Sequence, residues 1–216
     1  MSTGRQAAVF DFDGTLIRGD SVTAMLFFAR KRGLISPFYL LSAAWYGLLY
    51  HLGAIDAAKA KRRAHVFLAK LGEAQRESFL RDFAATLTAR IYPPGRKQLD
   101  SHRQAGDLVI LCSASCQCYM RYVAETLGVD ALLCTPSAAD GSMLGPNCRG
   151  PEKVRRVYQW LDGQAMPHSC LAAAYGDTPG DADILRASQH PVLVNPRKKL
   201  ARLMPEARQV WWRKQE

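Results

Sequence analysis

The chain has 216 residues, of which 48% are hydrophobic and 22% are charged. This composition can bury a core, and it excludes a disordered chain, a collagen-like chain and a disulfide-stapled miniprotein. The formal net charge of +10 leaves three kinds of anionic partner open: nucleic acid, acidic lipid or a phosphorylated substrate.

Short apolar runs typical of strands alternate with segments of helical period along most of the chain. The strand-like runs are residues 7–10, 108–112, 131–134, 171–175 and 191–194. The helical segments between them are residues 116–127, 152–161 and 181–187. This alternation predicts an α/β fold with a Rossmann-like parallel sheet that helices cover on both faces.

One long segment, residues 18–90, has helical period throughout and no strand-like run. Because it follows the first strand directly, we expect an inserted, all-helical cap over the end of the sheet. The predicted domains are therefore a core of residues 1–17 and 91–216 and a cap of residues 18–90. The sequence Tyr-Pro-Pro-Gly at 92–95 predicts the hinge at which the chain returns to the core.

Acidic and hydroxyl side chains follow the strand-like runs at the points where these end. Asp11 and Asp13 follow the first run, Ser113 follows the second, and Asp177 and Asp181 follow a later one. We expect them to meet, because the carboxyl ends of parallel strands form one ligand-binding edge. Clustered carboxylates repel one another unless a cation neutralises them, and their oxygen atoms suit Mg²⁺. The sequence therefore predicts a Mg²⁺ site beside two carboxylates that could attack a substrate and transfer a proton.

Each of these residues also has an ordinary structural interpretation. Taken alone, Asp177 and Ser113 are typical of helix caps or turns. Lys153 lies at the start of an amphipathic helix, where a lysine is usually solvated. The order of the residues along the chain favours the functional interpretation.

That order resembles the haloacid dehalogenase-like (HAD) hydrolase superfamily. The residues that carry the resemblance are Asp-Phe-Asp-Gly-Thr at 11–15 after an apolar strand, Ser113 after a second strand, Lys153, and Gly-Asp-Thr-Pro-Gly-Asp at 176–181. A helical insertion after the first motif resembles subfamily IB, which holds phosphoserine phosphatases and phosphatidylglycerophosphate phosphatases. The resemblance implies a phosphoric monoester hydrolase, a phosphatase.

The resemblance also implies a role for each motif residue. Asp11 would be the nucleophile that forms an aspartyl-phosphate, and Asp13 the general acid and base. Ser113, Ala114 and Lys153 would hold the phosphate of the substrate.

The implied cofactor is Mg²⁺. It would be held by Asp11, by the backbone carbonyl of Asp13 and by Asp177. Asp181 would support the site by a hydrogen bond to metal-bound water or to Lys153.

The substrate is less clear from the motifs. Ala-Ser at 114–115 and the last motif both depart from the phosphoserine phosphatase pattern, which weakens that assignment. Asp20 lies where those enzymes place an acidic residue facing the substrate amino group, although a helix cap is an equal alternative. We expect a small phosphorylated metabolite, such as phosphoserine or histidinol phosphate. A lipid-phosphate substrate and a phosphotransferase or phosphomutase activity are the alternatives.

Residues 33–55 contain no charged residue, and basic clusters at 30–32 and 59–63 flank them. A single membrane crossing would separate Asp11 from Asp177, which excludes it if the metal site exists. Helical spacing favours burial of this apolar surface within the cap. Peripheral contact with anionic lipid at the inner face of the membrane is the alternative.

The remaining features point to a cytoplasmic protein. Six cysteines lack zinc-site spacing and are expected to be reduced thiols, and the N-terminus lacks a secretory signal. The basic, tryptophan-containing tail from residue 197 is expected to be a solvated terminal helix, with no nucleic acid as partner. Arg62 and Arg63 are candidates for substrate contacts from the cap.

Overall fold

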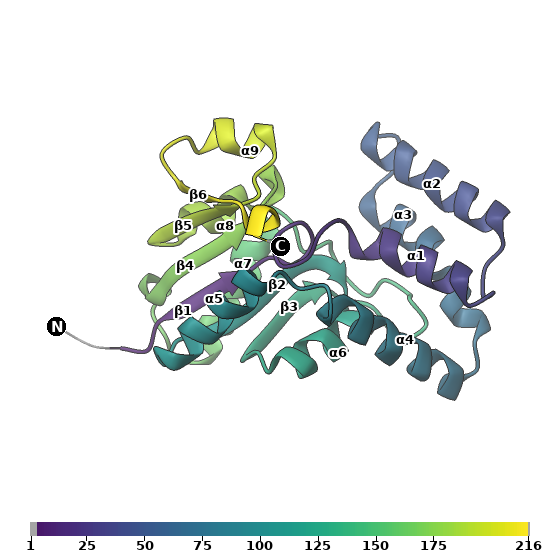
Figure 1. Ribbon diagram of the computed structural model, residues 1–216, viewed down its shortest axis with the longest axis horizontal. Coiled ribbons are helices and arrows are strands. Elements are labelled where there is room, and N and C mark those ends of the chain that lie inside the picture. Colours follow the sequence, from purple (N-terminus) through teal and green to yellow (C-terminus); the bar gives the residue numbers. More distant parts are fainter. Residues whose placement is uncertain (1–3, 216) are drawn as a thin grey trace.

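The computed structural model describes residues 4–215 of the chain. Six strands form one sheet in the order β3-β2-β1-β4-β5-β6, and each neighbouring pair is parallel (Figure 1). The strands are Ala7–Phe10 (β1), Leu108–Cys116 (β2), Ala131–Thr135 (β3), Leu171–Gly176 (β4), His190–Val194 (β5) and Arg208–Val210 (β6). The predicted α/β fold with a parallel sheet is confirmed.

Helices cover both faces of this sheet. Side chains of β1 alternate between two buried clusters, because successive residues of a strand point to opposite faces. Phe10 joins one cluster with α5 (Pro93–Gln104) and α6 (Gln117–Leu127). Val9 joins the other with α7 (Pro151–Gly163), α8 (Ala182–Ala187) and α9 (Lys198–Leu203).

The segment after β1 is helical, as predicted. Its elements are α1 (Ser21–Lys31), α2 (Pro37–His51), α3 (Ala57–His65), a 3₁₀ helix η1 (Val66–Lys70) and α4 (Glu73–Thr88). Figure 1 shows these helices beyond the carboxyl end of β1. The chain enters and leaves side by side, since Ile17 bridges Ile91 and the Tyr92 N–H donates to the Leu16 carbonyl at 2.9 Å. We therefore propose residues 18–90 as the cap.

The expectation that the apolar surface of residues 33–55 is buried within the cap is wrong for one face of α2. Ala43 is buried, but Phe38, Leu41, Trp45 and Leu48 are exposed. Helical spacing in the sequence predicts that apolar residues share a face; it does not specify which element covers that face. Between residues 4 and 215, no helix combines the length and apolar character that a membrane crossing needs.

The Pro-Pro pair at 93–94, within the predicted hinge, begins α5, because proline is well tolerated in the first turn of a helix. One local prediction needs correction. The tail is not one solvated helix. It forms α9, β6 and a 3₁₀ helix η4 (Trp212–Gln215), and Trp212 is buried with its ring centroid 6.1 Å from that of Tyr175.

Candidate active site

The ends of β1 and β4 and the first turn of α7 bring one ammonium group and two carboxylates into direct contact. Lys153 Nζ donates to Asp11 Oδ1 and to Asp181 Oδ1, both at 2.7 Å, and to the Cys112 carbonyl at 2.8 Å. Lys153 is 2% exposed. The alternative of a solvated lysine is therefore wrong, and the Lys153 ammonium is the centre of a buried charge network.

Asp177 is buried directly after β4, close to this network. Its Oδ1 atom is buried and has no hydrogen-bond partner among residues 4–215. Thr178, and not Asp177, is the N-cap residue of the short 3₁₀ helix that follows. Gly14 allows this close approach, because a Cβ at that position would lie 2.3 Å from Asp177 Oδ2. A buried carboxylate oxygen without a protein partner is unusual, and its lone pairs are available to coordinate a cation.

Asp11, Asp177 and Asp181 form a group that could hold a metal ion. One carboxylate oxygen from each residue lies within 4.8 Å of the others. Burial raises the pKa of Asp177 to about 8, with further contributions from the charges of Asp11 and Asp181. Burial likewise raises the pKa of Asp11 to about 6, despite the opposing effect of Lys153. A divalent cation would remove this repulsion, and a set of carboxylate oxygens fits Mg²⁺.

The Asp13 carboxylate has a separate set of partners. Ser21 donates to it through its backbone N–H at 2.8 Å and its hydroxyl at 2.9 Å, and the Ser115 hydroxyl also donates. The Ser21 hydroxyl lies 2.8 Å from the Tyr119 hydroxyl. Burial is the main cause that raises the pKa of Asp13 to about 7, and repulsion from the charge of Asp20 raises it further. Asp13 is thus held in one orientation with a pKa suited to proton transfer near neutral pH.

The remaining predicted residues lie at the same end of the sheet or near it. Ser113 is buried in β2, and its hydroxyl accepts from the Ser115 N–H at 3.0 Å. The Ala114 carbonyl accepts from the Thr135 hydroxyl at 2.6 Å. Asp20 is exposed and is the N-cap residue of α1, so the helix-cap interpretation describes its contact in this structure.

Lys61 of α3 reaches the site from the cap, although it was not among the predicted site residues. Its ammonium donates to the Ala114 carbonyl, to Thr135 Oγ1 at 3.1 Å and to Asn147 Oδ1 at 2.5 Å. Burial lowers its pKa. The two cap residues predicted instead lie elsewhere. Arg62 is exposed, and Arg63 donates to the Ser42 hydroxyl at 2.8 Å within the cap.

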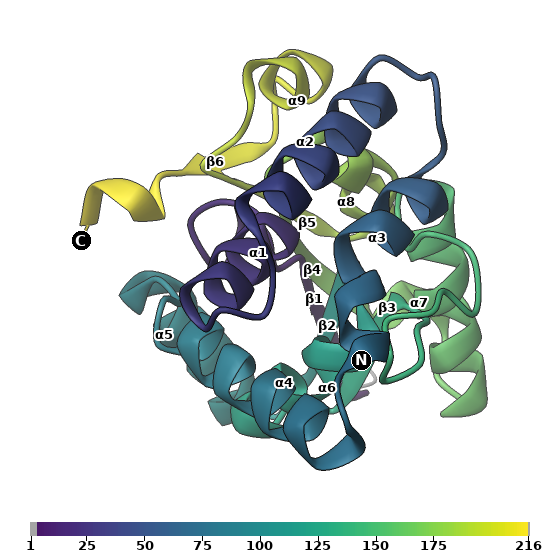
Figure 2. The same cartoon turned by 90° about the vertical axis from the view of Figure 1, so that its right-hand side faces the viewer.

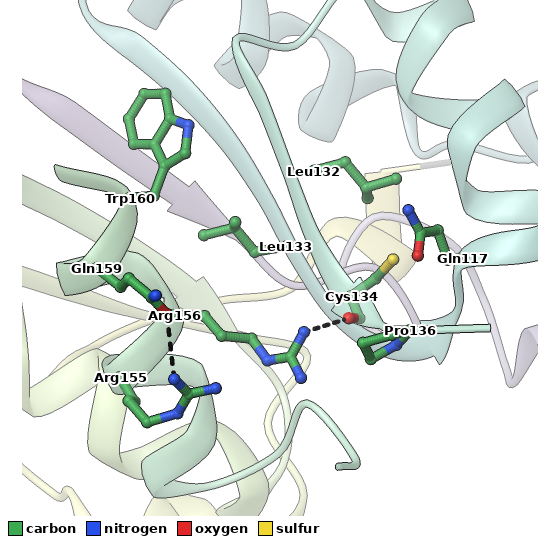
Figure 3. A pocket seen from close by; sticks show the side chains of 9 residues that line it. All are labelled: Gln117, Leu132, Leu133, Cys134, Pro136, Arg155, Arg156, Gln159 and Trp160. Atoms are coloured by element: carbon green, nitrogen blue, oxygen red, sulfur yellow. Dashed lines mark hydrogen bonds between the residues drawn. The ribbon is translucent and has the colours of Figure 1, made fainter. Parts of the chain in front are cut away.

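A separate cavity of about 360 Å³ lies between β3 and α7 (Figure 3). Its charged side chains are already paired within α7, because Arg155 and Arg156 both donate to Glu152 at 2.7 Å. Arg156 also donates to the Cys134 carbonyl at 2.8 Å. Its lining residues differ from the predicted site residues, and we assign no function to this cavity.

The chain is similar in sequence and in fold to known phosphatases and to proteins of unknown function. The chain is 27% identical over 219 residues to a histidinol-phosphatase of Neisseria meningitidis serogroup C, covering 96% of this chain and 97% of the relative. A Bordetella pertussis protein of unknown function has the same fold, with a TM-score of 0.85, 23% identity and coverage of 96% and 99%. A substrate-bound phosphoserine phosphatase also shares the fold, with a TM-score of 0.65, 14% identity and coverage of 93% and 91%.

A model of one protein family spans most of the chain. The haloacid dehalogenase-like hydrolase model matches residues 8–186, which include all the motifs that carried the resemblance. The resemblance inferred from the sequence is therefore confirmed, and the chain belongs to the haloacid dehalogenase-like hydrolases.

Proposed function

We propose that the chain is a Mg²⁺-dependent phosphomonoesterase that works through an aspartyl-phosphate on Asp11. The observation that carries the proposal is the buried contact of Lys153 with Asp11 and Asp181, next to the unpartnered oxygen of Asp177. Such an arrangement places a carboxylate nucleophile beside a cation that can also hold a phosphoryl oxygen.

Phosphoryl transfer to the enzyme uses both aspartates of the first motif. A carboxylate oxygen of Asp11 attacks phosphorus, and the bond between phosphorus and the ester oxygen breaks. Protonated Asp13 gives its proton to the leaving oxygen, so that a neutral alcohol departs. Burial is the largest cause that raises the pKa of Asp13 to about 7. A large fraction of its carboxyl group is therefore protonated near neutral pH.

Release of phosphate reverses the role of Asp13. Its carboxylate takes a proton from a water molecule while the water oxygen attacks phosphorus. The bond between phosphorus and the Asp11 oxygen breaks, inorganic phosphate leaves, and both carboxyl groups return to their starting states. Ser21 and Ser115 hold the Asp13 carboxylate in place through both half-reactions.

The remaining residues would hold the cofactor and the phosphate. Asp11 and Asp177, with the backbone carbonyl of Asp13, would hold Mg²⁺, which supplies positive charge to the phosphoryl oxygens when bound. Asp181 supports the site by its bond to Lys153. We propose that Ser113 and the backbone at Ala114 bind the phosphate together with Lys153.

We propose a small phosphorylated metabolite that carries an amino group as the substrate. The name of the Neisseria relative, a histidinol-phosphatase, supports histidinol phosphate. The exposed carboxylate of Asp20 lies close enough to Asp13 to raise its pKa and could pair with a substrate amine. Lipid phosphates and phosphoryl transfer to an acceptor sugar remain the alternatives for the test.

Release of inorganic phosphate from a panel of esters tests the proposal. The panel contains histidinol phosphate, phosphoserine and phosphatidylglycerophosphate, each with Mg²⁺ and with chelator, and each with and without an acceptor sugar. We expect the highest kcat/KM for an amine-bearing soluble ester, with activity lost on chelation and restored by Mg²⁺. Preference for the lipid ester would contradict the substrate assignment, and activity indifferent to chelator would contradict the metal.

Lys61 gives a prediction for the cap. Lys61→Met removes hydrogen bonds from the cap to three oxygen acceptors of the core, each worth on the order of 1 kcal/mol. We expect kcat/KM to fall by about tenfold or more, because the cap holds its position over the site less tightly. Arg62→Met, on the same helix but exposed, is the matched control and should leave kcat/KM unchanged. If both substitutions changed kcat/KM equally, the proposal that Lys61 holds the cap over the site would be incorrect.

A further inference from the structure

The outward side of α2 is an apolar surface, which we call the outer face of α2. Its residues are between 47% and 80% exposed, and they are Phe38, Leu41, Trp45, Leu48 and Leu52. Spacings of three and four residues place them along one side of the helix. Figure 2, which looks at this end of the molecule, shows α2 beside α1 and α3.

The opposite side of α2 already provides the contacts that hold the helix in the cap. The Tyr39 hydroxyl donates to the Arg63 carbonyl of α3 at 2.8 Å, and its ring lies 4.0 Å from the Arg63 guanidinium carbon. Ala43 is buried on this side. Folding of the cap therefore does not explain five large apolar side chains on the outer face, and contiguous exposed apolar surface of this kind marks a binding site.

The charge around α2 indicates what kind of partner fits. Residues 18–72 contain nine basic and two acidic residues, and α2 itself has no Asp, Glu, Lys or Arg. Exposed basic side chains lie on both neighbouring helices, with Arg30 and Lys31 at the end of α1 and Lys59 and Arg62 on α3. An apolar face with basic surroundings matches an anionic lipid surface. The acyl chains would contact the apolar side chains, and the anionic headgroups would pair with the basic side chains around them.

A second copy of the chain fits this surface less well. Pairing α2 with α2 would bring the same basic residues of two molecules together, and their repulsion opposes association. An apolar face along one side of α2 suits a position parallel to a membrane surface. We propose that the outer face of α2 docks the enzyme on an anionic lipid bilayer. This proposal does not depend on the proposed function.

Vesicle flotation of the full chain tests the docking directly. The vesicles contain either phosphatidylglycerol with phosphatidylcholine or phosphatidylcholine alone. We expect the wild-type chain to float with the anionic vesicles, and to do so much less with the neutral vesicles or at about 1 M salt, where charges are screened within about 3 Å. The Trp45 indole lies on the docking face, so binding should also shift tryptophan fluorescence to shorter wavelength.

A double variant and a matched control distinguish binding through the outer face of α2 from non-specific binding of exposed apolar side chains to vesicles. Leu41→Gln with Trp45→Gln should lower the fraction bound by about tenfold or more, because it removes two of the exposed apolar anchors. Leu144→Gln changes a leucine that is 68% exposed outside the cap, and should bind like the wild-type chain. Hydrolysis of a soluble aryl phosphate should be unchanged in both variants, which checks that they are folded.

Three outcomes would overturn the proposal. One is a wild-type chain that stays with the soluble fraction in the presence of anionic vesicles. Another is equal flotation of the wild-type chain and the double variant. The third is a concentration-dependent dimer, measured by analytical ultracentrifugation, that the double variant abolishes while vesicle binding is absent. That result would assign the outer face to a second copy of the chain.

Discussion

Asp11→Asn should lower phosphatase turnover by at least roughly a thousandfold, because the amide cannot act as the nucleophile that accepts the phosphoryl group. No aspartyl-phosphate should accumulate when the variant is mixed with substrate and quenched in acid. In the wild-type enzyme the same quench should trap a phosphorylated protein whose phosphate is released by hydroxylamine.

The loss of activity should not come from loss of the fold. Burial raises the pKa of Asp11 to about 6, so its charged form is disfavoured in the folded chain without metal. Asparagine has almost the same shape and removes one of three clustered negative charges. In metal-free buffer near pH 8, we expect the thermal midpoint of Asp11→Asn to equal or exceed that of the wild-type chain.

Asp13→Asn is the matched control for this experiment. It keeps the nucleophile but removes the group that transfers protons, so turnover should fall by roughly 10² to 10⁴-fold. Slow formation of the aspartyl-phosphate should remain detectable with a substrate whose leaving group needs no proton, such as an aryl phosphate. If Asp11→Asn retains turnover, or if Asp13→Asn and Asp11→Asn both fail to form any phosphoenzyme, the assignment of the two roles is incorrect.

The sheet was predictable because its signal is local. Buried parallel strands appear as continuous apolar runs, and the five predicted runs all became strands, within a few residues of the expected ends. β6 was missed because Arg208–Val210 is three residues long and has one apolar residue. Its pairing with β5 depends on the tertiary position of the tail, which composition does not encode.

The acidic part of the site was predictable for the same reason. A carboxylate directly after a buried strand can point only toward the end of the sheet, so Asp11 and Asp177 were placed by the strands before them. Ser21 and Lys61 lie on helices of the insertion, and their positions depend on how the cap packs on the core. A serine that follows an aspartate and a lysine in a basic run have no distinctive sequence signal.

Lys153→Met gives the largest expected effect on stability. Lys153 neutralises two buried carboxylates, and its removal leaves Asp11 and Asp181 beside Asp177 without a cation. Breaking a buried ion pair by removing one partner typically lowers the free energy of unfolding by about 3–5 kcal/mol. We expect a loss of this size for metal-free Lys153→Met near pH 8, measured by urea unfolding.

The pH dependence separates charge from packing in this result. Although burial acts to raise it, Lys153 holds the pKa of Asp181 below its ordinary value. The stability from this lowered pKa is present above the ordinary value near 4 and is lost as pH falls through the folded-state value. Asp11 and Asp177 have raised pKa values of about 6 and 8, mainly through burial, so their charges destabilise the folded chain progressively as pH rises from about 4 to 8.

These opposite signs predict how the variant differs from the wild-type chain. Near pH 5, Asp11 and Asp177 are largely protonated, and of the three carboxyl groups Asp181 is the one that stays charged beside Lys153. The loss of unfolding free energy in Lys153→Met should therefore be smaller near pH 5, where Lys153 faces one negative charge, than near pH 8, where it faces more than one, and Mg²⁺ should recover part of the loss near pH 8. Arg155→Met, on the exposed side of the same helix, should leave the unfolding free energy essentially unchanged at either pH. An equal loss at the two pH values would mean that Lys153 stabilises the fold by packing its aliphatic chain, and not by holding the carboxylates together.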